Sequence, residues 1–265
     1  MSLSEHWLTD PASDVRHCLR LWVPDGAAPA DGFPVLIMLD GDWTWPALQD
    51  PVQNGLDDCI VLAMGYGADR PQVRVHRTRD YTPPAPDGGL WPDPRVPTRQ
   101  AGGAPGMLTF LTGPVLGWLA SQAPIHPQRI TLYGHSYGGL FVLYALAMQP
   151  TAIRSFVCAS PSLWWRKPTV QGLLDGLIQT PPADTVHITI LAGDQEQWHA
   201  APRPTEGPDT RSGGTPTLPW HQALQHRLAG IPNVCCQLEV ISGSSHGALL
   251  PISARRALTL AAHRP

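Results

Sequence analysis

The chain has 265 residues and a formal net charge of −3, and its basic residues are 17 arginines and the single Lys167. A chain of this length can bury one large core, and no stretch indicates a second core, so we expect a single domain over residues 1–265. The basic residues are scattered rather than gathered on one predicted helix, which argues against a nucleic-acid partner.

The five cysteines lack the spacing of a metal site and mostly lie in apolar segments, so we expect reduced core residues and no bound metal. The first ten residues lack a basic stretch followed by an apolar one. No later run approaches the ~20 apolar residues of a membrane-spanning helix. We therefore expect a cytoplasmic protein without a membrane partner.

The first strands are predicted by apolar patterning. Residues 15–23 alternate roughly in polarity before a Pro-Asp-Gly turn, which is typical of a half-buried edge strand. Residues 34–39 and 59–64 are continuous apolar runs, which favours two parallel central strands covered on both faces. The segment between these two runs leaves room for a crossover helix.

A long segment of different character follows. Residues 69–106 are rich in proline, glycine and arginine and show no hydrophobic period, so we expect a long, functional loop. A helix is expected over residues 105–120, and Pro114 argues against a straight one.

Strands and helices alternate through the rest of the chain. Apolar and β-branched runs predict strands at residues 129–133, 155–159, 186–192 and 234–241. Helices are expected at residues 140–148, 170–178, 220–228 and 252–262, and a second Pro/Gly-rich loop at about 200–219. This alternation predicts an α/β fold with a doubly wound, mostly parallel sheet, helices on both faces and ligands at the carboxyl ends of the strands.

The stretch Gly134-His135-Ser136-Tyr137-Gly138 lies between a predicted strand and a predicted helix. It matches the G-x-S-x-G nucleophile elbow, in which small residues two positions away on each side keep Cβ atoms apart in a tight turn. Because the flanking elements are the ones that this motif requires, we interpret Ser136 as a nucleophile.

A serine nucleophile needs a base and usually an acid, in the chain order Ser, Asp or Glu, His. His246, in a turn after the last predicted strand, is the predicted base, with His199 and His221 as alternatives. Asp194 directly follows a predicted strand and is the preferred acid. Glu196 is close enough to compete, and a Ser–His pair without a strong acid is the third alternative.

Acyl transfer also requires N–H donors for the oxyanion of the tetrahedral intermediate. One is expected to be the backbone N–H of Tyr137, the residue after the nucleophile. The other is expected in the loop that follows the strand at 34–39, where Gly41 or Asp42 is the candidate.

Several further motifs accompany the elbow in order. They are Leu39-Asp40-Gly41-Asp42, Arg77-Thr78-Arg79-Asp80-Tyr81-Thr82-Pro83, Gly102-Gly103-Ala104, Ala159-Ser160-Pro161-Ser162-Leu163-Trp164-Trp165 and Ser245-His246-Gly247. With them the chain resembles the esterase D-like branch of the α/β hydrolases, and most of all its siderophore esterases, over residues 35–250. The elbow joined to A-S-P-S-L-W-W is the most specific part.

The resemblance implies an α/β-hydrolase fold and a serine esterase that needs no metal or cofactor. Members of that family hydrolyse the esters of a cyclic trilactone that carries catechol groups, as in enterobactin, and release iron from the ferric complex. By motif, Ser136 would be the nucleophile and His246 its base, and the substrate would be a ferric or apo siderophore.

The resemblance also implies that Arg77 and Arg79 face the anionic ligand, a role that suits the guanidinium fork. The alternative is that Asp80 pairs with one of these arginines to hold the loop. Trp164 and Trp165 would either form an aromatic wall of the site or belong to the core.

The substrate class has alternatives, because the segment at 82–100 is unusually Pro-rich and the family varies there. The first is a general carboxylesterase that acts on feruloyl or short-chain acyl esters. A ferric-siderophore binding protein without turnover and an acyltransferase built on the same residues are the two others.

Overall fold

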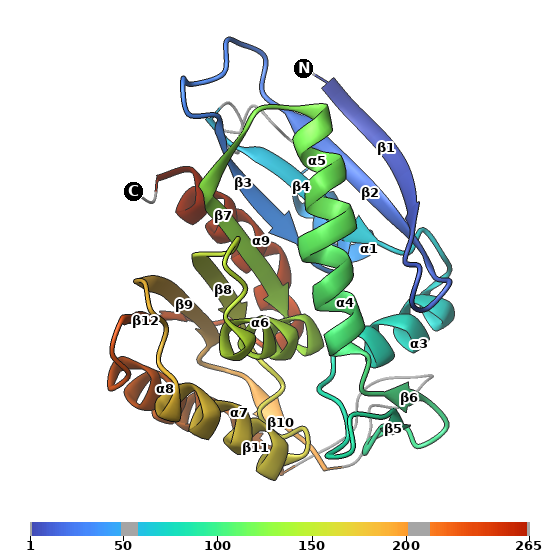
Figure 1. Cartoon of the computed structure of the whole chain (residues 1–265). Helices are drawn as coiled ribbons and strands as arrows, with labels where there is room; N and C mark the ends of the chain where they lie inside the picture. Colours follow the sequence, from blue (N-terminus) through green and yellow to red (C-terminus); the bar gives the residue numbers. More distant parts are fainter. Residues whose placement is uncertain (1, 49–57, 201–212, 264–265) are drawn as a thin grey trace.

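A computed structural model describes residues 2–48, 58–200 and 213–263. Its centre is an eight-stranded sheet in the order β1-β2-β4-β3-β7-β8-β9-β12 (Figure 1). From β4 onward each strand is parallel to its neighbours, whereas β2 is antiparallel to both β1 and β4. The strands are β1 Ser2–Thr9, β2 Arg16–Val23, β3 Phe33–Met38, β4 Ile60–Gly65, β7 Ile125–His135, β8 Ser155–Ala159, β9 Val186–Gly193 and β12 Val234–Ile241. The predicted mostly parallel α/β sheet is confirmed.

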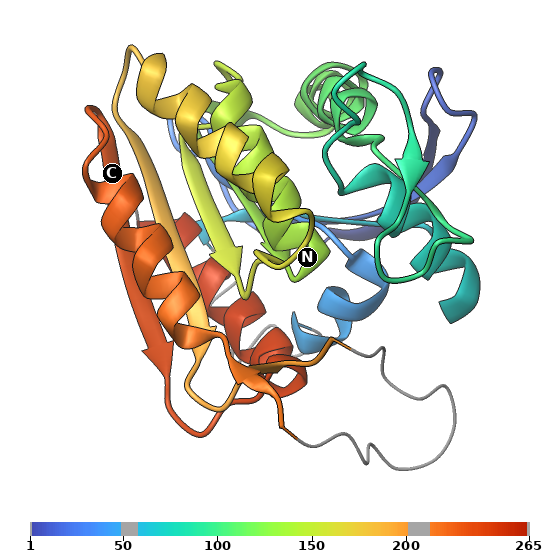
Figure 2. The same cartoon turned by 90° about the horizontal axis from the view of Figure 1, so that it is seen from below.

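Alternate residues of the central strands face two separate apolar cores. On β3, Val35 and Ile37 pack into one core and Leu36 and Met38 into the other. Helices lie over both faces of the sheet (Figure 2). The first face carries α3 Arg70–Asp80, α4 Ala104–Phe110, α5 Leu116–Gln122, α6 Tyr137–Met148, α7 Lys167–Gln179 and α8 Leu218–Ala229; the second carries α1 Gly41–Thr44, the 3-10 turn η1 Trp45–Leu48 and α9 His246–His263.

β2 is not an edge strand as predicted. β1 pairs along its whole length, from Ser2 opposite Val23 to Thr9 opposite Arg16. The side chains of β1 from Leu3 to Thr9 are all exposed or half-buried. A strand without a buried face has no hydrophobic period, which is why patterning missed it.

The long loop predicted over residues 69–106 is wrong in its first part, because residues 70–80 form α3. Asp69 caps this helix by accepting a 2.9 Å hydrogen bond from the Gln72 backbone N–H, and Pro71 occupies its first turn. The buried face consists of Val73, Thr78 and Asp80. Two of these three residues are polar, so the sequence shows no apolar repeat with helical spacing.

The remainder of that segment contains a short hairpin, in which β5 Trp91–Pro92 pairs with β6 Gln100–Ala101. Most of the second predicted loop, residues 201–212, lies outside the described residues, and beside it β10 Gln197–Trp198 pairs with β11 Thr215–Pro216. The helix predicted over residues 105–120 is α4 and α5 joined by the π-helical turn Leu111–Val115, which contains Pro114.

All five cysteines are free. Within residues 2–48, 58–200 and 213–263, no helix combines the length and the hydrophobicity that a membrane crossing requires.

Stability is expected to fall on mild acidification because His17 is buried without a partner for its Nε2 atom. Its ring packs 4.9 Å from that of Phe110 and 5.1 Å from that of Tyr66. Burial lowers the pKa of His17 to about 4. Below about pH 6.5, His17 becomes protonated in the unfolded chain but stays neutral in the folded chain. As the pH falls toward 4, this difference lowers the free energy of unfolding by up to about 3 kcal/mol.

Urea denaturation of the wild type and of His17→Phe between pH 8 and pH 4.5 measures this cost. The wild type should lose stability more steeply than the variant. The variant keeps the smaller slope due to the buried His135 and His221, whose pKa values are also lowered by burial. Equal slopes for the two proteins would contradict the expectation.

Candidate active site

Ser136 lies between the last residue of β7 and the first residue of α6. Its backbone has φ 60° and ψ −114°, a conformation that side-chain-bearing residues rarely adopt. The neighbouring strand holds this turn, because the Ser136 N–H donates to the Ala159 carbonyl at 2.9 Å. The chain therefore makes the sharp strand-to-helix turn that the motif predicts, at the carboxyl end of a central strand.

The first glycine of the motif, Gly134, is needed because the turn brings its backbone against the backbone of Gly138. A Cβ added at Gly134 would lie 2.3 Å from the Gly138 carbonyl carbon. We expect Gly134→Ala to lose several kcal/mol of unfolding free energy or not to fold, since rigid backbone atoms must move. Gly106→Ala is the matched control, because nothing lies within 4 Å of a Cβ there. Equal thermal unfolding midpoints for the two variants would contradict this steric explanation.

A cavity of about 440 Å³ opens beside Ser136. The Ser136 hydroxyl lies 3.4 Å from the Ser162 hydroxyl, at hydrogen-bonding distance. His246 lines the same cavity. The other lining residues belong to α1, α3, the turn of the β5–β6 hairpin, the end of β7, the loop after β8 and the first turns of α6 and α9.

His246 contacts Glu196, not the preferred candidate Asp194. Its Nδ1 lies 3.0 Å from Glu196 Oε2. Asp194 is exposed, and its carboxylate instead accepts a 3.2 Å hydrogen bond from Ser242. The turn after β9 explains the difference, because the Gly193 N–H donates to Glu196 Oε1 at 2.7 Å and so draws Glu196 inward. The structure thus corrects Asp194 to Glu196 as the carboxylate beside the imidazole.

Glu196 is only 2 % exposed. Burial by itself raises the pKa of its carboxyl group, but the hydrogen bonds from His246, Ser160 and Gly193 and the charge of His246 together lower that pKa to about 2. Glu196 is therefore an anion at neutral pH. It is placed to accept the Nδ1 proton of His246, which leaves Nε2 available as a base.

His135, the residue before Ser136, contacts both the backbone and the ring of His246. Its Nε2 lies 2.9 Å from the His246 carbonyl oxygen, and the two rings are 4.6 Å apart. Burial lowers the pKa of His135 well below its usual value, so the ring is neutral. Because a carbonyl oxygen only accepts, Nε2 carries the proton. A second cation next to the imidazolium is thereby avoided.

The two arginines predicted to face the ligand are both paired within the protein. Arg77 forks onto Asp40, with Nε 2.7 Å from Oδ1 and Nη2 2.8 Å from Oδ2, and its side chain still lines the cavity at Ser136. Arg79 pairs with Asp80 at 2.6 Å and lies outside that cavity. For Arg79 the alternative of an arginine that holds its own segment is therefore the correct one.

Other arginines line the cavity and were not singled out by motif. They are Arg70, Arg74, Arg95 and Arg99. The cluster of arginines in the 69–106 segment was the signal that could have found them, because α3 and the hairpin turn bring that cluster to one wall.

The two tryptophans predicted at the site separate. Trp164 lines the cavity, and its ring lies beneath the guanidinium of Arg95 at 4.7 Å. Trp165 is fully buried, and its Nε1 donates to Asp93 at 3.2 Å. Of these two tryptophans, Trp164 is therefore the one placed to form an aromatic wall, and Trp165 belongs to the core.

The expected oxyanion donors lie at the starts of two helices. Tyr137 begins α6 and Gly41 begins α1, and the first N–H groups of a helix have no acceptor within it. The Asp42 carboxylate points elsewhere and accepts hydrogen bonds from the backbone N–H groups of Tyr66 and Gly67 at 2.7 and 3.0 Å. Only main-chain groups at positions 41 and 42 are therefore candidates.

Comparison with known proteins agrees with this geometry. Residues 16–215 match the family model "Esterase", described as "Putative esterase". The chain belongs to this esterase family. The predicted carboxylic ester hydrolase in the α/β-hydrolase fold is thereby confirmed.

Individual relatives of this esterase are siderophore esterases by name. The ferri-bacillibactin esterase BesA of Bacillus subtilis (strain 168) is 28 % identical over 91 % of this chain and 82 % of its own length. The apo-salmochelin esterase of Escherichia coli O6:H1 is 32 % identical over 71 % of this chain and 60 % of its own. The solved structure of the enterobactin hydrolase IroE in complex with DFP superposes with a TM-score of 0.76 at 26 % identity, covering 99 % of this chain and 95 % of that one.

The esterase has a second cavity, of about 530 Å³, next to the first. Arg95, Trp164, His246 and Gly247 line both, so the two cavities meet at the imidazole. The aromatic side chains of Trp198 and Trp220 also line this second cavity. The space around His246 therefore suits a bulky acyl or alcohol group.

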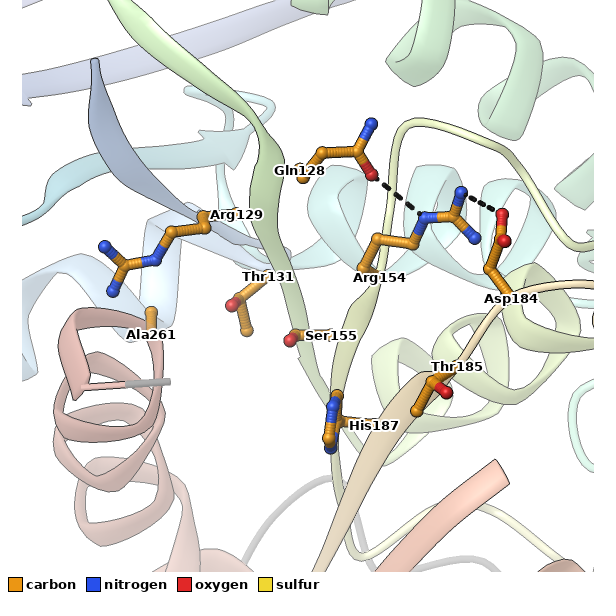
Figure 3. Close-up of a pocket in the computed structure, with 9 residues that line it drawn as sticks. All are labelled: Gln128, Arg129, Thr131, Arg154, Ser155, Asp184, Thr185, His187 and Ala261. Atoms are coloured by element: carbon orange, nitrogen blue, oxygen red, sulfur yellow. Dashed lines mark hydrogen bonds and ion pairs between the residues drawn. The ribbon is translucent and has the colours of Figure 1, made fainter. Parts of the chain in front are cut away.

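A third cavity, of about 480 Å³, lies away from the elbow, at the amino-terminal parts of β7, β8 and β9 (Figure 3). Arg154, one of the two arginines that line it, lies between Gln128 at 3.2 Å and Asp184 at 2.6 Å. Ser136 and Glu196 follow the opposite, carboxyl ends of β7 and β9. We therefore assign the chemistry to the cavities at the elbow.

Proposed function

We propose that this esterase hydrolyses the ester bonds of a catecholate siderophore, in the ferric or apo form, of the enterobactin-type trilactone class. One observation carries the proposal. Among the residues that the structure describes, the cavity at Ser136 is lined by five arginines and by no aspartate or glutamate; these arginines are Arg70, Arg74, Arg77, Arg95 and Arg99. A cleft with one sign of charge concentrates ligands of the opposite sign, and a catecholate complex is anionic. The names of the relatives support the same substrate class.

Ser136, His246 and Glu196 supply the chemistry in this proposal. His246 Nε2 takes the hydroxyl proton as Ser136 Oγ attacks the ester carbonyl, and the tetrahedral intermediate then expels the alcohol, which receives that proton. Glu196 holds the imidazole through Nδ1 and stabilises its cation. Water, activated by the same histidine, then releases the acid from the acyl-enzyme.

Backbone N–H groups of Tyr137 and of Gly41 or Asp42 stabilise the oxyanion in this proposal. They head two helices that begin at the ends of neighbouring strands, β7 and β3, so they are held without a reorganisation cost. The charge of Arg77 faces the same space. Asp40 accepts two hydrogen bonds from the Arg77 guanidinium, and these bonds hold the group in one position before the ligand binds.

The remaining arginines and Trp164 bind the ligand beyond the scissile ester. Guanidinium groups pair with catecholate oxygens and stack on catechol rings, and an indole offers a further flat face. We place the reaction in the cytoplasm, after uptake. Free thiols on all five cysteines suit a reducing compartment.

Mass spectrometry of the products tests the proposal. The wild type is incubated with ferric and iron-free enterobactin and with p-nitrophenyl butyrate, and Ser136→Ala serves as the blank. We expect ring-opened trilactone fragments from the wild type, with kcat/KM above that for the butyrate ester. Turnover of the butyrate ester without trilactone fragments would identify a general carboxylesterase. Binding of the ferric complex without products would identify a binding protein.

A further inference from the structure

Asp93 is a buried carboxylate in the Pro-rich segment that carries two of the cavity's arginines. It is 1 % exposed. Its Oδ1 accepts hydrogen bonds from the backbone N–H groups of Arg95 at 3.0 Å and Val96 at 2.8 Å. Its Oδ2 accepts from the Tyr137 hydroxyl at 2.8 Å and from Trp165 Nε1 at 3.2 Å. One side chain thus collects four donors from three separate parts of the chain.

Two of the four donors shape the turn between β5 and β6, residues 93–99. The Asp93 carboxylate folds the first half of this turn back on itself, as an Asx turn does. Its backbone N–H closes the other side by donating to the Arg99 carbonyl at 2.9 Å. Arg95, Val96 and Arg99 of this turn all line the cavity at Ser136. Asp93 therefore fixes the backbone from which the side chains of Arg95 and Arg99 extend.

The other two donors attach the turn to the catalytic framework. Tyr137 follows Ser136 directly, and Trp165 lies in the loop after β8, beside the cavity residue Trp164. The Tyr137 ring lies 5.8 Å from the Trp164 ring and 5.4 Å from the Arg77 guanidinium. The turn that carries Arg95 and Arg99 is thereby attached to the start of α6, which also presents the nucleophile.

We infer that Asp93 is a specificity-determining positioning residue, which holds the turn 93–99 so that Arg95 and Arg99 face an anionic part of the ester. The inference rests on the proposed function in one respect, that this cavity receives an anionic ester. The residue itself need not touch the substrate. It acts through the turn and through Tyr137.

A carboxylate is required because all four partners donate. An asparagine of the same shape accepts through one oxygen and presents an N–H₂ group in place of the other. Two donors would then face each other at Trp165 Nε1 or at the turn. A buried donor left without an acceptor is unfavourable, so the turn is expected to move away. The helix start at Tyr137 keeps its own backbone contacts within α6.

The test uses two nearly isosteric probes, the p-nitrophenyl monoester of glutaric acid, which is anionic, and p-nitrophenyl valerate, which is neutral. For Asp93→Asn we expect kcat/KM for the glutarate ester to fall about tenfold, mostly through KM, and that for the valerate ester to stay within about twofold, as loss of oriented charge predicts. The preference of the wild type for the glutarate ester should weaken with salt, and that salt dependence should largely disappear in the variant.

Asp87→Asn is the matched control, since Asp87 lies in the same segment but only accepts a 2.9 Å hydrogen bond from Gly89 in an exposed turn. It should leave both esters at wild-type rates. If Asp93→Asn does not fold, as judged by its thermal unfolding midpoint, Tyr137→Phe removes one of the four donors and should shift the same ratio in the same direction by a smaller factor.

Two outcomes overturn the inference. One is an unchanged ratio of the two kcat/KM values in a folded Asp93→Asn or Tyr137→Phe protein. The other is an equal loss on both esters, which would make Asp93 a support of the elbow alone. A wild type that prefers the glutarate ester but spares enterobactin would refute the proposed substrate and leave the role of Asp93 intact.

Discussion

Glu196→Gln is expected to lower kcat for ester hydrolysis about 1,000- to 10,000-fold. The amide cannot stabilise the imidazolium, and it can present an N–H₂ group to His246 Nδ1, which favours the wrong tautomer. The loss should be large here because Glu196 is buried and held by Ser160 and by the Gly193 N–H as well as by His246. Steady-state kinetics with p-nitrophenyl butyrate, with the fold checked by circular dichroism, measures it.

Asp194→Asn is the matched control, two positions away in the same turn. Because its side chain contacts Ser242 and is exposed, kcat should stay within about threefold of wild type. The reverse result, a large loss at Asp194 and a small one at Glu196, would show that the acid is the one preferred from sequence. Small losses in both variants would indicate a Ser–His pair that works without an acid.

Ser136→Ala is expected to abolish turnover, with kcat at least about 10,000-fold below wild type, because no covalent intermediate can form. A fluorophosphonate probe should add one phosphonyl group to the wild type and none to the variant, as read by intact-protein mass spectrometry. The variant should still fold, since alanine at position 136 keeps the backbone and loses only the hydroxyl.

Ser162→Ala is the control for this experiment, because the Ser162 hydroxyl lies 3.4 Å from Ser136 Oγ. It should remain active and should still be labelled. Labelling of Ser136→Ala, together with loss of labelling in Ser162→Ala, would move the nucleophile to position 162.

Local patterns were sufficient for the core of the sheet and for the elbow. The apolar runs at 34–39 and 59–64 predicted β3 and β4 because strands covered on both faces must be apolar throughout. β1 and α3 escaped the same reasoning. β1 has no buried face, and α3 buries Thr78 and Asp80, whose burial is possible only because Asp80 finds Tyr66 and Arg79 at 2.9 and 2.7 Å.

The sequence by itself determined the fold class, the serine in its strained turn and the histidine beyond the last strand, since each depends on residues that are close together along the chain. Only the tertiary structure decided which carboxylate contacts that histidine and which arginines reach the cavity. Asp194 and Glu196 are two positions apart in the same turn, and the hydrogen bonds from the Gly193 N–H and the Ser160 hydroxyl select Glu196. Arg77 and Trp165 are placed by Asp40 and Asp93, buried acceptors that lie far from them in the sequence. Arg79 pairs with its neighbour Asp80, which the more distant Tyr66 hydroxyl also contacts.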